Sequence, residues 1–355
     1  MARTFIGTVV WLLLLILFSG ASLAPLSGEE LENYIKKKLK HHPTILKLND
    51  KFLGEAGAHT LAESSLLENV ETLVIYNGNL GDEGVKMLAK SRHFKKLTSL
   101  SLETDQITDL GAKIIAESNV FSKLKVLNLH HNQVGDRGVM ALASSRLLEN
   151  LTDLNLNYNQ IGDMGVWRLT HSKTLKNLRK LELAYNPLGK KGKDSYERFT
   201  ITQSIKRSYE ENRLQEIGST LSGDLSVEVL LELPYASELE TLNLKNAGLS
   251  NSAAVAIAHS KKLAKLTHLD LSGNRIGDEG AVALAESQGL KNLQRLNLNF
   301  NFIGDKGAIA IAQSVNLPSL VSLKLGQNRI GGEGARALTE SETLKNLRHP
   351  VFGFY

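Results

Sequence analysis

Several residue types are scarce or absent in this chain of 355 residues. It has no cysteine, which excludes disulfide bridges, thiolate-bound zinc or iron–sulfur centres and a thiol nucleophile. Six prolines argue against a proline-rich linker protein. An excess of only five basic side chains, 42 against 37 acidic ones, gives no indication of nucleic-acid binding. The hydrophobic content of 42% is that of an ordinary globular chain.

The N-terminal segment 1–24 differs from the rest of the chain. After Arg3, the stretch 5–18 (FIGTVVWLLLLILF) carries no charge and runs into small residues. A basic start, an apolar core and small residues before a cleavage point, here after Ala21 or Ala24, are typical of a secretory signal peptide. The alternative is an uncleaved membrane anchor, because residues 5–24 just reach the roughly 20 residues that span a bilayer. Both interpretations predict an exported protein, secreted or held in the cell envelope, whose only membrane contact is through this segment.

The rest of the chain is a tandem repeat. The pattern Leu-x-x-Leu-x-Leu-x-x-Asn-x-Ile-Gly-Asp-x-Gly, complete at 151–165, recurs with a 27-residue period. The repeats fill 42–345, which is eleven units plus seven residues, so one degenerate unit with an irregular insertion at about 187–237 lies between two regular series. The units begin at 42, 69, 96, 123, 150 and 177, and then at 238, 265, 292 and 319.

Each unit predicts a strand, a turn and a helix. The leucines of the first half alternate as on a short strand, and the second half, Gly-Ala-x-x-Leu-Ala-x-Ser at 57–64 and 280–287, has the period of an amphipathic helix. The Asp of Gly-Asp-x-Gly is expected to cap that helix. The Asn at the tenth position is expected to bond backbone groups where the strand ends. Four units lack this amide and are expected to lose the bond, at Lys51, Gly78, Asp105 and Ala247.

Such a unit cannot bury its leucine face alone, so the units are expected to stack side by side. We therefore predict an α/β solenoid in which about eleven parallel strands form one continuous concave sheet and the helices cover the convex side.

The repeated unit, followed by Gly-Ala-x-x-Leu-Ala, resembles the ribonuclease-inhibitor-like class of leucine-rich repeats. Its cysteine-free, uniformly 27-residue form is most similar to bacterial members such as the GALA-type proteins. The resemblance implies a right-handed α/β horseshoe, recognition of protein partners and, usually, no catalysis by the repeats.

Three segments outside the regular repeats have predicted roles. Residues 25–41 contain Ser27-x-x-Glu30 before an apolar helical stripe and are expected to be a capping helix. Residues 346–355 are expected to cover the other end of the core. For the insertion two interpretations stay open: a loop or bent helix that covers its own apolar residues, or a basic and aromatic protrusion that contacts a partner.

The best candidate for a partner-binding site is the middle of the concave face. Tyr158 and Tyr185 occupy the same position in consecutive repeats and are therefore expected to be neighbours. Large aromatic rings among short polar groups on a rigid sheet are typical of binding hot spots. The full set of predicted partner-binding residues is Asn128, His130, Asn155, Asn157, Tyr158, Glu182 and Tyr185.

No catalytic, metal or cofactor site is predicted. His130 and His131 are adjacent, and adjacent strand residues point to opposite sides unless a bend intervenes, so we expect no metal there. The favoured function is that of a non-catalytic exported protein that binds a protein partner through its concave face, with host interaction as one setting. The alternatives are a structural or self-associating protein of the cell envelope, and a hydrolase that uses the insertion.

Overall fold

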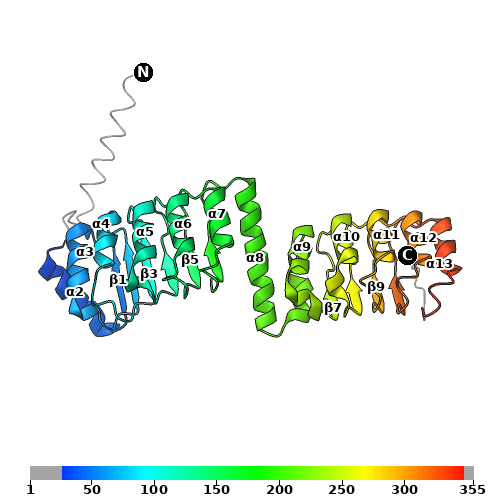
Figure 1. Ribbon diagram of the computed structural model, residues 1–355, viewed down its shortest axis with the longest axis horizontal. Helices are drawn as coiled ribbons and strands as arrows, with labels where there is room; N and C mark the ends of the chain where they lie inside the picture. Colours follow the sequence, from blue (N-terminus) through cyan, green and yellow to red (C-terminus); the bar gives the residue numbers. More distant parts are fainter. Residues whose placement is uncertain (1–25, 348–355) are drawn as a thin grey trace, which may run out of the picture. The chain divides into compact units, whose positions relative to one another are not determined.

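The computed structural model describes residues 26–347, and the chain divides into two compact units, Met1–Tyr196 and Glu197–Tyr355 (Figure 1). The predicted signal peptide at 1–24 and most of the predicted C-terminal cap at 346–355 lie outside the described residues.

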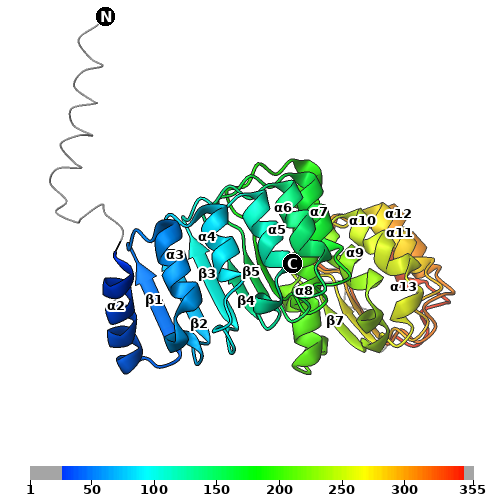
Figure 2. The same cartoon turned by 60° about the vertical axis from the view of Figure 1, so that its left-hand side comes forward.

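The first unit alternates short parallel strands with short helices (Figure 2). One six-stranded sheet contains, in order, β1 (Ile45–Asn49), β2 (Thr72–Tyr76), β3 (Ser99–Glu103), β4 (Val126–Asn128), β5 (Asp153–Asn155) and β6 (Lys180–Glu182). The helices are α2 (Gly28–His41), α3 (Gly54–Glu63), α4 (Gly81–Leu88), α5 (Asp109–Glu117), α6 (Asp136–Ser144) and α7 (Asp163–Thr170), with 3-10 turns η1 (Ser65–Leu67) and η2 (Asn119–Phe121).

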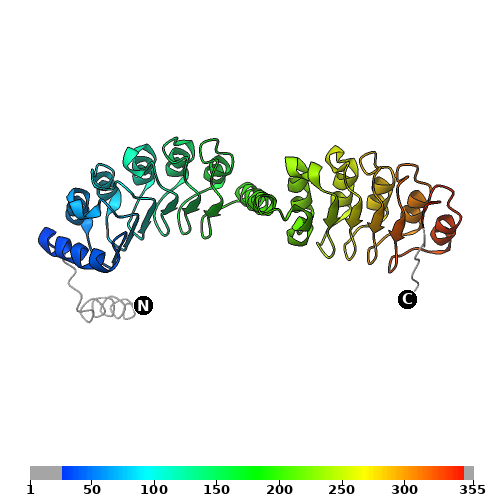
Figure 3. The ribbon, with the colours of Figure 1, turned by 90° about the horizontal axis from the view of Figure 1, so that it is seen from below.

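The second unit repeats this arrangement around a four-stranded parallel sheet. Its strands are β7 (Thr241–Asn243), β8 (His268–Asp270), β9 (Arg295–Asn297) and β10 (Ser322–Lys324). Its helical elements are η3 (Leu214–Thr220), α9 (Asp224–Glu232), η4 (Pro234–Glu238), α10 (Asn251–His259), η5 (Lys261–Leu263), α11 (Asp278–Ala285), α12 (Asp305–Ala312) and α13 (Gly332–Thr339). Within each unit the helices lie on one side and the strands on the other (Figure 3).

The leucines of the repeat form rows across the strands. In the first sheet the register pairs Leu46, Leu73, Leu100, Leu127, Leu154 and Leu181, each with the next. All six are buried on the helix side of the sheet, where each contributes about 2 kcal/mol by leaving water. Leu242, Leu269, Leu296 and Leu323 form the same row in the second sheet.

The prediction of one continuous sheet is wrong, because the described strands form two sheets. The degenerate unit folds its helix half as α9, but its strand half is the 3-10 turn η3. At this place a strand leucine is replaced by Gln215, whose side-chain oxygen accepts hydrogen bonds from the backbone of Glu240 and Thr241 at 3.1 Å each. Residues 214–220 therefore cover the edge of β7 without extending the sheet.

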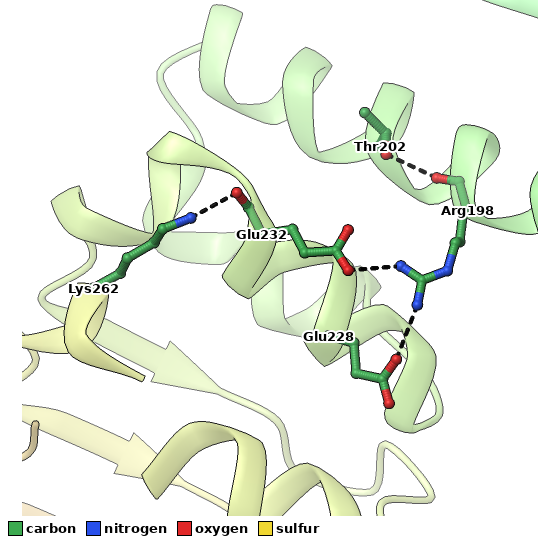
Figure 4. Close-up of polar contacts among 5 residues, drawn as sticks. All are labelled: Arg198, Thr202, Glu228, Glu232 and Lys262. Carbon is green, nitrogen blue, oxygen red and sulfur yellow. Dashed lines mark hydrogen bonds and ion pairs between the residues drawn. The ribbon is translucent and has the colours of Figure 1, made fainter. Parts of the chain in front are cut away.

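The first part of the insertion is a long helix, α8 (Lys190–Glu210), with 21 residues. Its first part belongs to the first unit, where the Tyr196 hydroxyl donates to the carbonyl of Leu181 on β6 at 2.8 Å. Its later part belongs to the second unit, where Ile205 is fully buried in the core. The Arg198 guanidinium bridges Glu232 at 2.9 Å and Glu228 at 3.1 Å on α9 (Figure 4). The insertion thus covers core in both units.

The N-terminal helix α2 has the predicted capping box. The Glu30 amide donates to the Ser27 hydroxyl at 3.3 Å, and the Ser27 amide donates to the Glu30 carboxylate at 2.9 Å. Leu31 and Ile35 are fully buried and face the first repeat.

The asparagines at the tenth position bond the unit before them, as expected. Asn132 accepts the amide of Ile107 at 3.0 Å and donates to the carbonyl of Leu102 at 2.7 Å. The same pair of bonds recurs at Asn159, Asn186, Asn274, Asn301 and Asn328. Each asparagine therefore satisfies backbone groups that would otherwise be buried without a partner.

The aspartates of Gly-Asp-x-Gly cap a different helix from the one expected. Asp136 of Gly-Asp-x-Gly accepts the amides of Gly162 at 2.7 Å and Gly165 at 3.1 Å, at the start of the next helix. Asp109, whose motif is Thr-Asp-x-Gly, makes the same pair of bonds, to the amides of Gly135 at 2.7 Å and Gly138 at 2.8 Å. A Cβ at Gly138 would lie 2.8 Å from that carboxylate oxygen, so the close approach requires glycine. The negative charge still lies at a helix N-terminus, but the bond joins neighbouring repeats.

Asp105 stands where most units have asparagine, and its carboxyl keeps only half of the amide's bonds. One oxygen, Oδ1, accepts the amides of Gly78 at 2.8 Å and Leu80 at 3.4 Å. The other, Oδ2, takes the place of the donor nitrogen and is buried without a partner. Burial raises the pKa of Asp105 to about 7 against the amide bonds, which lower it. Protonation restores a donor at this position.

We expect the Asp105→Asn variant to be more stable than the wild type above pH 7 and equal to it near pH 4. The folded chain holds the Asp105 proton more tightly than the unfolded chain. The contribution of the protonated carboxyl to the free energy of unfolding is therefore complete below about pH 4, and it is lost as the pH rises through 7. A pKa difference of this size corresponds to ~4 kcal/mol. Urea unfolding at both pH values measures the difference.

The matched control is Asn132→Asp, which places the same carboxyl one unit further along. The free energy of unfolding of Asn132→Asp should fall as the pH rises, in the same direction as the contribution of Asp105 in the wild type. Equal pH dependence in wild type and Asp105→Asn would contradict the assignment.

Ile205→Ala should weaken the second unit, because it leaves a cavity in that core. The expected loss in the free energy of unfolding is about 2–4 kcal/mol, and Ile205→Val, which removes one methyl group, should lose about 1 kcal/mol. Hydrogen–deuterium exchange of α9 in the full chain would reveal the loosening. Exchange in Ile205→Ala that equals wild type would show that α8 does not support this core.

Candidate functional site

The ninth residue of every regular repeat leaves its strand with a positive φ. In the middle of the first sheet these residues are His131, Tyr158 and Tyr185, at φ 53, 54 and 59. Bulky side chains rarely adopt this left-handed conformation. It persists here because the backbone amides continue the ladder: that of His131 donates to Asn157 and that of Tyr158 to Ala184, both at 2.9 Å.

Four rings meet at this bend; we call His130, His131, Tyr158 and Tyr185 the aromatic cluster. The Tyr158 and Tyr185 rings stack with centroids 4.0 Å apart and planes 15° apart, which confirms that they are neighbours. Both histidine rings contact Tyr158, with centroids 5.1 Å away for His130 and 5.8 Å away for His131. Tyr158 is 41% exposed and Tyr185 72%, so the stack presents a large apolar surface to solvent.

A bend intervenes between His130 and His131, so their side chains do not point to opposite sides as those of adjacent strand residues would. The left-handed bend at His131 brings both rings to one side, with centroids 6.1 Å apart and edges against faces. Within residues 26–347, no group of three or more His, Asp and Glu side chains is placed to hold a metal ion.

The polar residues predicted for the site support the bends beneath the cluster. The amide oxygens of Asn128 and Asn155 accept the backbone amides of His130 at 3.0 Å and Asn157 at 2.9 Å. Asn157 in turn accepts the amide of Ala184 at 2.6 Å. Asn128 and Asn155 therefore lie beside the aromatic cluster, but their side-chain oxygens already accept hydrogen bonds from the backbone.

Charge near the cluster is paired. The Asn157 amide nitrogen donates to Glu182 at 3.3 Å, and Glu182 also pairs with Lys180 at 2.6 Å. The hydrogen bond and ion pair with Glu182 raise the pKa of Lys180 above its usual range. Glu103, which was not predicted, accepts a hydrogen bond from Asn128 at 2.7 Å.

A pocket of about 360 Å³ adjoins Tyr185, and the sequence did not indicate it. Asn157, Glu182 and Tyr185 line it together with Lys193 and Tyr196 from α8. Burial, and then the charge of Glu182, raise the pKa of Tyr196. These α8 residues lie outside the repeat pattern, so the 27-residue spacing could not place them.

A larger groove, of about 670 Å³, lies on the exposed face of the second sheet. It was also missed, and its polar residues share only the sixth position of the repeat with the predicted site; the others lie at the fourth position. The polar residues of this groove are Thr241, Asn243, His268, Asp270, Arg295, Asn297, Ser322 and Lys324.

The helices of residues 26–347 are all too short or too polar to cross a bilayer. The predicted anchor at 5–24 lies outside this range.

Comparisons with known proteins agree with this architecture. A family model described as "Leucine Rich repeat" matches five segments, at 122–143, 148–166, 262–285, 289–312 and 316–338. No curated protein matches the chain. The chain is a leucine-rich-repeat protein, and its fold is an α/β solenoid of strand-and-helix repeats.

Solved structures of several proteins are similar to the chain. An internalin of Listeria monocytogenes strain 4b F2365 has 19% identity over 90% of this chain and 92% of that one, with a TM-score of 0.27. Internalin C2 of the same strain has 24% identity over 60% and 81%, with a TM-score of 0.27. A plant ice-binding protein has 16% identity over 81% and 73%, with a TM-score of 0.25. Identities and TM-scores this low carry no inference about what this chain binds.

The tyrosine stack has a measurable signature. A hydrogen bond to the Tyr185 side chain raises the pKa of Tyr158, because the Tyr158 hydroxyl donates it only when protonated. Tyr185→Phe should lower the Tyr158 pKa towards the ordinary value of about 10. NMR of ¹³Cζ-labelled tyrosine measures this titration, with Tyr76→Phe as a control that leaves Tyr158 unchanged. An unaltered titration in Tyr185→Phe would disprove the contact.

Proposed function

We propose that this protein is a non-catalytic scaffold that binds a protein partner through the exposed face of its first sheet. The observation that carries the proposal is the exposed stack of Tyr158 on Tyr185. Large rigid aromatic side chains with polar groups around them are enriched among binding hot spots.

Preorganisation supports the proposal. The Tyr158 backbone is fixed by the ladder, and the ring of Tyr158 is held between Tyr185 and the two histidines. A partner that covers these rings therefore loses little side-chain entropy on binding, which favours affinity.

The hydrolase alternative would need reactive groups in the insertion. The long polar side chains of α8 instead make structural contacts: Arg198 pairs with Glu228 and Glu232, and the Tyr209 ring stacks on Tyr235 with centroids 4.2 Å apart. These contacts favour a supporting role for α8 over catalysis.

Self-association through the helices is the other alternative. It would use the apolar side chains that recur on the later helices, Val255, Val282 and Ile309, and these are half-buried. This packing favours contacts between neighbouring helices of the same chain over self-association. Export by residues 1–24, a bacterial source and a host setting belong to the same proposal and rest on the sequence.

The test is capture of partners by the immobilised full chain, followed by affinity measurement with the purified partner. Tyr158→Ala/Tyr185→Ala should weaken binding about 30-fold or more, because a hot-spot side chain contributes about 2 kcal/mol or more. Trp167→Ala, at an exposed aromatic residue on α7, is the matched control and should bind like the wild type. Equal binding by the tyrosine double variant would refute the proposed surface.

A further inference from the structure

The groove on the second sheet is built by side chains from all four of its strands. The register places His268 beside Arg295 and Arg295 beside Ser322 in one row. The next row along the strands places Asn297 between Asp270 and Lys324. The strand leucines alternate into the core, so the outward side chains of the groove are polar.

The exposed faces of the two sheets carry opposite charge. We compare positions four, six, eight and nine of each repeat, which are the outward strand positions and the bend. In the first sheet these hold two lysines, Lys47 and Lys180, against four carboxylates, Asp50, Glu103, Asp153 and Glu182. In the second sheet they hold Lys245, Arg295 and Lys324 against Asp270 alone.

The single carboxylate of the second face is already occupied. Asp270 accepts the Ser272 hydroxyl at 2.6 Å and amide at 2.8 Å, and it accepts the Asn297 side chain at 2.9 Å. Within the described chain, neither Arg295 nor Lys324 forms an ion pair, and both are exposed. The groove therefore offers two cationic groups to a ligand.

We propose that this groove binds an acidic, extended polypeptide segment of a protein partner, with Arg295 and Lys324 each contacting a carboxylate. The two residues lie on adjacent strands, two positions apart along them, so their Cα atoms are separated by ~8 Å. Alternate side chains of an extended segment lie on one face ~7 Å apart, which matches this separation. Acidic side chains at positions i and i+2 of the segment would reach both cations.

The occupant is an acidic segment of a partner and not residues 1–25 or 348–355 of this chain. Residues 1–25 and 348–355 contain neither Asp nor Glu. The inference rests on the proposed function in one respect, that an exposed sheet face is a binding surface, but it concerns the second sheet and is tested without the tyrosines.

The test uses the full chain and a fluorescein-labelled hexaglutamate peptide, with binding followed by fluorescence anisotropy. Arg295→Gln/Lys324→Gln should weaken binding about tenfold or more, since two charge-assisted contacts are lost. Because the whole chain is basic, the matched control is Lys306→Gln/Arg336→Gln, which removes the same charges from α12 and α13 of the same unit. This control should bind within about twofold of wild type.

Three further measurements bear on the proposal. Arg295→Lys/Lys324→Arg keeps both charges and should retain binding, which separates charge from damage to the fold. Added salt should weaken wild-type binding more than that of the double glutamine variant. Tyr158→Ala/Tyr185→Ala should bind hexaglutamate like the wild type. The proposal for the groove can therefore fail without the proposal for the tyrosine surface failing, and the reverse.

Several results would overturn the inference. If Lys306→Gln/Arg336→Gln weakens peptide binding as much as Arg295→Gln/Lys324→Gln does, the effect is due to net charge and not to the groove. Displacement of the peptide by inorganic phosphate at lower concentration than by free glutamate, or tighter binding of a single-stranded oligonucleotide, would assign the groove to phosphate. A dimer in light scattering that Arg295→Gln/Lys324→Gln abolishes would assign it to a second copy of this chain.

Discussion

The structure depends on hydrogen bonds that side chains make to the repeat before or after their own. A single repeat leaves the amides and carbonyls at its strand end and helix start without partners, and their burial would be costly. Asn132 reaches back to the preceding repeat, and Asp109 reaches forward to the next helix. Ser145 reaches back again, donating to the carbonyl of Ala116 at 2.5 Å. A repeat that carries all three of these residues is therefore bonded to its neighbours at three places, which enforces the constant repeat length.

The same requirement explains the irregular parts of the chain. Where a sheet ends, something other than a strand must cover its last edge. At β6 the Tyr196 hydroxyl donates a hydrogen bond to the carbonyl of Leu181. At β7 the side-chain oxygen of Gln215 accepts hydrogen bonds from the amides of Glu240 and Thr241. The insertion and the degenerate repeat are thus terminators for two shorter arrays.

The repeat spacing predicted the strands, the helices, the asparagine bonds and the contact between Tyr158 and Tyr185, because all of these follow from translation by one repeat. It did not predict the division into two sheets, because the loss of a strand at 214–220 depends on single residues such as Gln215 and not on period. The orientation of His131 was left open, because alternation along a strand ends at a bend and the repeat spacing does not show that His131 is left-handed. The groove near Arg295 was not predicted, because the predicted site was centred on the tyrosines at the ninth position of the repeat, whereas Arg295 lies at the fourth position.

The left-handed bend also governs how recognition can change over evolutionary time. At this position the backbone is held by its neighbours, and the residue types already range from Thr104 and Gln327 to Phe300 and Gly273. A substitution at this position changes an exposed side chain on the same backbone, and it leaves the leucines, the asparagines and the helices unaltered. Specificity can therefore drift one substitution at a time while the scaffold stays intact.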